Sequence, residues 1–227
     1  ADVDGDGDID LLIPRARTNT VVVWLNNGNA TFSPPTSSSG VDYNPIMATT
    51  GDLDGDGDLD MVVACNSGSV SLRFNDAGPG QFQSPYNQSL PLAGAYGVAT
   101  GDLDNDGDQD IVASSSTTGV VAAWLNNGNR QFTAVPLLTV GTGPTGLSLS
   151  DINGDGMLDL VVANNQSYNV SVAFGNGNGT FRITQTLAAN NPREALLGDI
   201  DGDGDLDLVV PEISGQQANT YLNSGQG

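Results

Sequence analysis

The sequence predicts an all-β fold: a β-propeller of four-stranded antiparallel blades, built from about five repeats of 48–50 residues. Two observations support this prediction. Five nine-residue segments, here called the acidic loops, begin at residues 2, 52, 102, 151 and 199, so that successive starts lie 50, 50, 49 and 48 residues apart. The same order of short apolar segments follows each loop. A fixed period of this length marks an architecture in which one supersecondary unit is copied several times.

The fourth repeat shows the expected strands most clearly. Residues 146–150 alternate between apolar and polar side chains, as in a half-buried strand, and the acidic loop of residues 151–159 follows. We then expect a strand, a polar turn, a strand, a hairpin and a last strand, at residues 160–163, 164–169, 170–174, 175–179 and 180–187. Four strands in about fifty residues are typical of propeller blades.

The blades are expected to divide a single repeat domain, residues 1–227, at 1–40, 41–90, 91–139, 140–188 and 189–227. The first repeat has no strand before its loop, and the fifth ends before a fourth strand. Unpaired strand edges are normally covered. Three solutions stay open: sequence beyond this chain, five blades closed imperfectly, or partner chains that supply neighbouring blades. The abrupt start inside an acidic loop, which no signal peptide resembles, indicates a processed protein or a segment of a longer one.

Large apolar residues recur at two positions of the repeat, and we expect them to fill the space between neighbouring blades. They are Leu25, Phe74, Leu125, Phe174 and Leu222 at one position, and Phe32, Phe82, Phe132 and Phe181 at the other. Trp24 and Trp124 share a third position, occupied elsewhere by Arg73, Ala173 and Tyr221. Such variability suits the surface of a blade, where an aromatic ring could stack on a sugar. Cys65 ends an apolar segment and is expected to be a small core residue.

The charge is concentrated in the acidic loops. The chain has 27 acidic residues, six arginines, no lysine and no histidine, for a formal charge of −21, and 23 of the acids lie in the loops. This pattern indicates cation binding rather than a solvating acidic tail. It argues against nucleic acid as a partner, because nothing could neutralise a row of phosphates. No stretch is long and apolar enough to insert in a membrane.

Each acidic loop offers oxygen ligands at positions one, three, five and nine, and a glycine at position six allows a sharp turn. Position seven is aspartate in four loops but Met157 in the fourth, so it is expected to contribute its backbone carbonyl. Sites made only of oxygen favour calcium over magnesium and exclude zinc, and we expect about five calcium ions, one per loop. The predicted ligands are Asp2, Asp4, Asp6, Asp8 and Asp10; Asp52, Asp54, Asp56, Asp58 and Asp60; Asp102, Asp104, Asp106, Asp108 and Asp110; Asp151, Asn153, Asp155, Met157 and Asp159; Asp199, Asp201, Asp203, Asp205 and Asp207.

These patterns, Asp-x-Asp-Gly-Asp-Gly-x-x-Asp before an apolar strand and Asn-Asn-Gly-Asn-x-x-Phe in the later hairpin, resemble the FG-GAP and VCBS repeats. That family includes the propeller heads of integrin α subunits, bacterial surface and secreted proteins, and some fungal lectins. The resemblance covers nearly the whole chain. It implies four-stranded blades with calcium between the first and second strands, and it selects the same ligands.

The resemblance implies a non-catalytic adhesion or recognition module for glycan or protein ligands. Hard-oxygen loops suited to weak calcium binding favour an extracellular or cell-surface location, where calcium is abundant. The ligand would contact the turns opposite the acidic loops, at residues 14–20, 66–69, 114–119, 164–169 and 211–218.

The alternative is a structural subunit of a cell-surface or filamentous assembly, in which neighbouring copies add strands to exposed edges. In a eukaryotic source it would be glycosylated at Asn29, Asn87, Asn165, Asn169 and Asn178. Intrinsic catalysis is the weakest hypothesis, because the chain has no histidine to act as a general base and no lysine to form a Schiff base. The chain could still be the non-catalytic part of a larger secreted enzyme.

Overall fold

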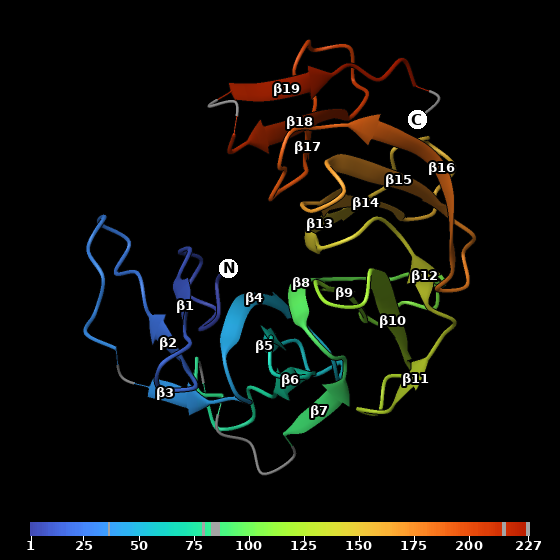
Figure 1. Ribbon diagram of the computed structural model, residues 1–227. Helices are drawn as coiled ribbons and strands as arrows, with labels where there is room; N and C mark the ends of the chain where they lie inside the picture. The colour runs from blue at the N-terminus through green and yellow to red at the C-terminus, as the bar shows by residue number, and fades with distance from the viewer. Residues whose placement is uncertain (36, 79, 83–86, 215–216, 226–227) are drawn as a thin grey trace.

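The computed structural model describes residues 1–35, 37–78, 80–82, 87–214 and 217–225, and in these ranges it contains 19 β-strands and no helix. The strands form five antiparallel sheets that follow one another around an arc (Figure 1). The propeller architecture predicted from the repeats is therefore confirmed. Within the described residues, no helix is long and apolar enough to cross a membrane.

Each sheet contains strands that are consecutive in the chain. The first contains β1 (Leu11–Arg15), β2 (Thr20–Trp24) and β3 (Ser37–Gly40). The second contains β4 (Pro45–Gly51), β5 (Asp60–Cys65), β6 (Ser69–Arg73) and β7 (Gln88–Pro91). The third contains β8 (Ala95–Gly101), β9 (Asp110–Ser115), β10 (Val120–Asn126), β11 (Phe132–Ala134) and β12 (Leu138–Thr139), and both β11 and β12 pair with β10. The fourth contains β13 (Pro144–Ser150), β14 (Asp159–Asn164), β15 (Asn169–Gly175) and β16 (Phe181–Ala188), and the fifth β17 (Leu196–Gly198), β18 (Asp207–Glu212) and β19 (Gln217–Tyr221).

The first and fifth sheets lie at the two ends of the arc, and each contains three strands among the described residues (Figure 1). In the first sheet, β1 directly follows the acidic loop, so the strand that precedes the loop in the other sheets is missing there. In the fourth sheet, the observed strands begin and end within two residues of the expected ones. Local alternation of apolar and polar residues was therefore sufficient to place the strands.

Apolar clusters fill the spaces between successive sheets. At three of these interfaces, a recurrent large residue of one sheet shares a cluster with the recurrent phenylalanine of the next. The pairs are Leu25 with Phe82, Phe74 with Phe132, and Leu125 with Phe181. This arrangement confirms the expected role of both positions within the arc.

The prediction is wrong for the two residues at the ends of the arc. Phe32 is 38% exposed and Leu222 is 62% exposed, because the described residues provide no sheet beyond the first or the fifth to cover them. The surface position expected for Trp124 is also wrong, because its ring is only 4% exposed and belongs to the cluster between the second and third sheets. Cys65 is fully buried, as expected of a core residue.

Candidate metal centre

Each acidic loop lies at the same end of its sheet, directly before the second strand of the blade. The backbone of the loop winds around its first aspartate. In the first loop, Asp2 Oδ1 accepts the N–H of Gly5 at 2.8 Å, and Asp2 Oδ2 accepts the N–H of Gly7 at 2.9 Å. The first aspartates of the second, fourth and fifth loops accept the equivalent pair of N–H groups. In the third loop, Asp102 Oδ2 accepts the N–H of Gly107 at 3.0 Å, and its Oδ1 accepts the N–H of Asp106 at 3.2 Å. The first aspartate therefore organises the turn in all five loops, with one altered bond in the third.

Two positions of this turn have a left-handed backbone. At position six, φ lies between 84° and 96° in all five loops, in the left-handed region that glycine adopts without strain, and this confirms the expected sharp turn. Position four also has positive φ, a requirement that the sequence analysis missed although the Gly-x-Gly spacing carries the signal. In the third loop position four is Asn105, and asparagine is enriched in this conformation.

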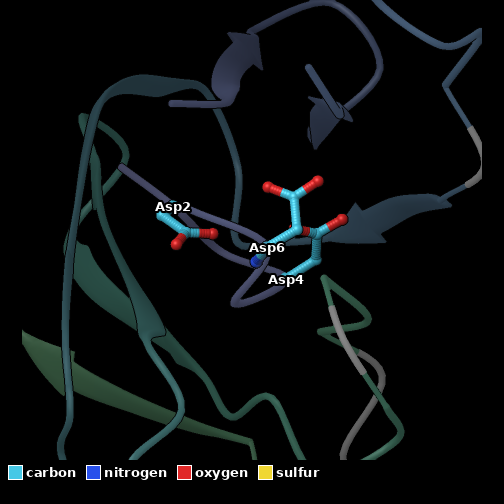
Figure 2. Close-up of side chains that lie close together, drawn as sticks. All are labelled: Asp2, Asp4 and Asp6. Atoms are coloured by element: carbon cyan, nitrogen blue, oxygen red, sulfur yellow. The ribbon is translucent and has the colours of Figure 1, made fainter. Parts of the chain in front are cut away.

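The loops bring carboxylate oxygens close together. Figure 2 shows Asp2, Asp4 and Asp6 grouped on the first loop. In four loops, three carboxylates each place one oxygen within 4.8 Å of the others. The groups are Asp2, Asp4 and Asp6; Asp52, Asp54 and Asp60; Asp102, Asp104 and Asp110; Asp199, Asp201 and Asp203. The fourth loop, which is described in full, forms no such group of carboxylates, because its position three is Asn153, whose amide would supply the oxygen.

The aspartate at position nine, the last residue of the acidic loop, bonds to the start of the loop and to the hairpin of the same blade. Asp110, which is fully buried, accepts the N–H of Leu103 through Oδ2 at 2.8 Å and the N–H of Asn126 through Oδ1 at 2.7 Å. The equivalent aspartates make the same two bonds in the other four loops. The loop and the hairpin after the third strand are thereby held together by one carboxylate.

Burial makes the position-nine carboxylates of the second and third loops costly to ionise. It raises the pKa of Asp60 to about 7 and that of Asp110 to about 6, against the opposing effect of two backbone N–H donors at each. A buried carboxylate is stabilised in its charged form by a nearby cation. Clustered hard oxygens, some of them buried, are the donor set that calcium requires, so the residues present fit this ion.

Position seven directs its side chain toward the hairpin of its own blade. A Cβ placed on Gly28 would lie 2.5 Å from Asp8 Oδ2, and a Cβ on Gly128 would lie 2.8 Å from Asp108 Oδ2. Met157 occupies the same place over Gly177 in the fourth blade. The close carboxylate groups include no side chain from position seven. This geometry agrees with binding through the backbone carbonyl at that position, which stays a prediction, as do the other ligand assignments.

Each of the first four acidic loops is also bonded to the next sheet, a link that the sequence analysis missed. The first asparagine of the hairpin reaches back to the carbonyl at position two of the preceding loop. Asn75 Nδ2 donates to Val3 O at 3.1 Å, Asn126 Nδ2 to Leu53 O at 2.8 Å, and Asn223 Nδ2 to Ile152 O at 2.9 Å. The fourth blade has Gly175 here, and the backbone N–H of Gly179 donates to Leu103 O instead, at 3.3 Å. These bonds tie each of the four loops to the hairpin of the next sheet.

The second loop has a positively charged side chain beside it. Arg130, in the hairpin of the third blade, donates hydrogen bonds to Asp54 and Asp76, and its guanidinium lies 4.4 Å from the ring centroid of Phe74. Burial raises the pKa of Asp54, and the bond from Arg130 opposes this shift. The equivalent hairpin positions are uncharged, namely Ala30, Gly80 and Gly179. The second loop thus differs electrostatically from the others.

The fold and the acidic loops together define a repeat propeller with candidate cation sites. The profile of the FG-GAP-like repeat matches residues 2–63, 52–113, 102–162 and 151–210. The chain belongs to the FG-GAP-like repeat family, as its motifs indicated. Comparison with curated proteins finds no match.

Several solved structures are similar to this chain. A lectin from Agrocybe aegerita that recognises non-reducing terminal N-acetylglucosamine is 21% identical over 100% of the chain, with a TM-score of 0.60. BBS1N, solved in complex with ARL6DN, is 13% identical over 99% of the chain, with a TM-score of 0.62. A functionally unknown protein from Desulfotomaculum acetoxidans is 14% identical over 89%, with a TM-score of 0.64. This chain covers 62%, 67% and 59% of their lengths, and at these identities the likeness concerns the fold alone.

Proposed function

We propose that the protein is a calcium-stabilised, non-catalytic recognition module that acts outside the cell or at its surface. The observation that supports it best is the acidic loop, repeated five times, with close carboxylate groups in four loops and a buried aspartate at position nine in all five. Positions one, three, five and nine would hold about five calcium ions through side chains, and position seven through its carbonyl. Bound calcium supplies the positive charge that offsets repulsion among the carboxylates of one loop.

The acidic loops would therefore set the rigidity of the module. Without a counter-charge, the aspartates of one loop repel one another and favour an open hairpin. The position-nine aspartate and the hairpin asparagine would pass this change on, because they bond the loop to its own hairpin and to the next sheet. Family membership supports the extracellular location, since calcium is abundant there and weak sites would be filled.

Recognition is assigned to the opposite end of the sheets. The turns between the second and third strands lie there, at residues 14–20, 66–69, 114–119 and 164–169, together with 211–218, of which residues 215 and 216 fall outside the described ranges. A glycan or a protein is the proposed ligand, and the similarity in fold to a lectin supports this class. The absence of histidine and lysine from the sequence supports a non-catalytic role.

A second candidate is a structural subunit of a filamentous or cell-surface assembly. It is favoured by exposed apolar residues at the two ends of the arc, namely Ile9, Leu11 and Ile13 in and beside β1, and Leu196 and Leu222 in β17 and after β19. A neighbouring copy would cover them. Of the five Asn-x-Ser/Thr acceptors, Asn29, Asn87 and Asn178 are exposed, whereas Asn165 and Asn169 are half-buried, so glycosylation in a eukaryotic source is proposed first at the exposed three.

One pair of experiments separates the two candidates. Light scattering in calcium and then in chelator measures the particle mass, and a glycan array with a cell-surface protein panel, read in calcium, measures binding. A monomer that binds a ligand in calcium supports the recognition module. A calcium-dependent polymer without a ligand supports the structural subunit, and a chain that neither binds nor assembles contradicts both.

A further inference from the structure

The turn between β14 and β15 contains a tyrosine in a backbone conformation that disfavours it. Tyr168 has φ of 56°, and its carbonyl accepts the N–H of Ala189 at 3.0 Å. The same bond is made by Asn19, Gly68 and Gly119 in the equivalent turns, all with positive φ. The fold therefore imposes this conformation, in which glycine and asparagine are common and a bulky side chain is strained.

Packing does not explain why a tyrosine is present. The side chain of Tyr168 is 58% exposed, so little of the ring is buried to offset the strain. Instead it borders an open hollow of about 440 Å³ between the fourth and fifth sheets. Backbone strain that no packing compensates is a feature of functional sites.

The other walls of this Tyr168 hollow are two alanines and four polar residues, one of which is a buried carboxylate. They include Ala188, Asn190, Glu212, Gln217 and Asn219. Glu212 is 6% exposed; its Oε1 accepts the N–H of Asn190 at 2.6 Å and Asn219 Nδ2 at 2.7 Å, and its Oε2 accepts Gln217 Nε2 at 3.1 Å. The carboxylate thus orients two side-chain amides, with their oxygens as further acceptors.

These groups select a class of ligand. The amides and the phenol hydroxyl both donate and accept, which matches hydroxyl groups of a ligand. Among the described walls there is no arginine, so an anionic ligand has no counter-ion here. The carboxylate of Glu212 is buried and accepts three uncharged donors, so it offers little free surface to a cationic ligand. An exposed tyrosine ring offers a flat apolar surface beside a polar tip, suited to the C–H face of a sugar ring.

We propose that the Tyr168 hollow binds a neutral sugar, with one ring face on Tyr168 and its hydroxyls on the amides that Glu212 orients. This inference rests on the proposed recognition function and narrows it to one interface between blades and one ligand class. The site lies at the end of β14 opposite the acidic loop, because the loop precedes that strand and the turn of Tyr168 follows it.

The test uses Tyr168→Gly, a change that the backbone favours. Glycine adopts φ of 56° without strain, so the variant is expected to unfold at the same temperature as the parent or higher. Parent and variant are compared in calcium on a printed array of neutral and acidic oligosaccharides, followed by calorimetric titration of the best-bound neutral sugar. We expect the variant to bind the sugar about tenfold more weakly than the parent, as for the loss of one aromatic contact.

Ala30→Gly is the control, because Ala30 also has a positive φ, of 62°, but lies in the hairpin beside the first acidic loop, outside the turns assigned to recognition, and the change is expected to leave sugar affinity unchanged. Neutral-sugar binding that survives Tyr168→Gly overturns the site but leaves the recognition function intact. Binding of only acidic glycans, or only of a protein from the surface panel, overturns the ligand class. If the parent binds nothing in any assay, the proposed function fails as well.

Discussion

Replacing Asn126 by alanine tests the bond that ties an acidic loop to the next sheet. Asn126 is 3% exposed, and its Nδ2 donates to Leu53 O in the second loop and to Gln109 O in its own. Leu53 is fully buried, so its carbonyl would lose the amide donor without gaining water. Leaving one buried acceptor unpaired costs about 1–3 kcal/mol. Gln109 is only half-buried, so its carbonyl can bond to water instead and adds nothing to this cost.

The assay is thermal unfolding followed by circular dichroism, in calcium. For a chain of this size each kcal/mol lowers the unfolding temperature by about 2–4 °C, so a loss of about 2 kcal/mol predicts a shift of about 4–8 °C. Asn26→Ala is the control, because Asn26 Nδ2 donates to Ile9 O in its own exposed loop and no described sheet precedes the first. Its expected cost is within about 0.5 kcal/mol. Equal shifts for the two variants would refute the interlocking of loop and neighbouring sheet.

Three further predictions concern Arg130, Cys65 and the buried aspartates Asp60 and Asp110. Arg130→Gln should raise the calcium affinity of the second loop severalfold, because the guanidinium competes with calcium for Asp54; an unchanged calorimetric isotherm would contradict this. Cys65 should react with a thiol reagent only after unfolding, because it is fully buried and burial raises the pKa of its thiol to about 11; fast labelling of the native protein would be the opposite result. The metal-free protein should be more stable at pH 5 than at pH 8, as unfolding temperatures in chelator would show. Burial raises the pKa of Asp60 and Asp110 above that of unfolded aspartate, so the native state binds more protons and its stability falls as the pH rises from about 4 to 7. Greater stability at pH 8 would mean that these two groups do not dominate.

Much of the fold followed from local sequence. The period of the acidic loops and the alternation of side chains placed the strands, because both signals arise within one blade. The left-handed backbone at position six could be anticipated from glycine for the same reason.

The rest depended on which sheet stands beside which. The burial of Trp124 and the exposure of Leu222 are set by the presence or absence of a neighbouring sheet, not by their own segments. The contact of Arg130 with Asp54 joins residues 76 positions apart, and a single sequence carries no signal for it. The positive φ of Tyr168 accompanies a hydrogen bond from Ala189, 21 residues further along the chain, and a single sequence carries no signal for that bond.

The central claim is that the acidic loops stabilise the propeller by binding calcium, and the unfolding temperature in calcium and in chelator tests it most directly. Calcium at about ten times the dissociation constant of a site stabilises the folded state by about 1.4 kcal/mol per site. Each kcal/mol raises the unfolding temperature of a chain of this size by roughly 2–4 °C. With about five sites, the account therefore predicts that the unfolding temperature is more than about 10 °C higher in calcium than in chelator. An unfolding temperature that is the same in both solutions would contradict it.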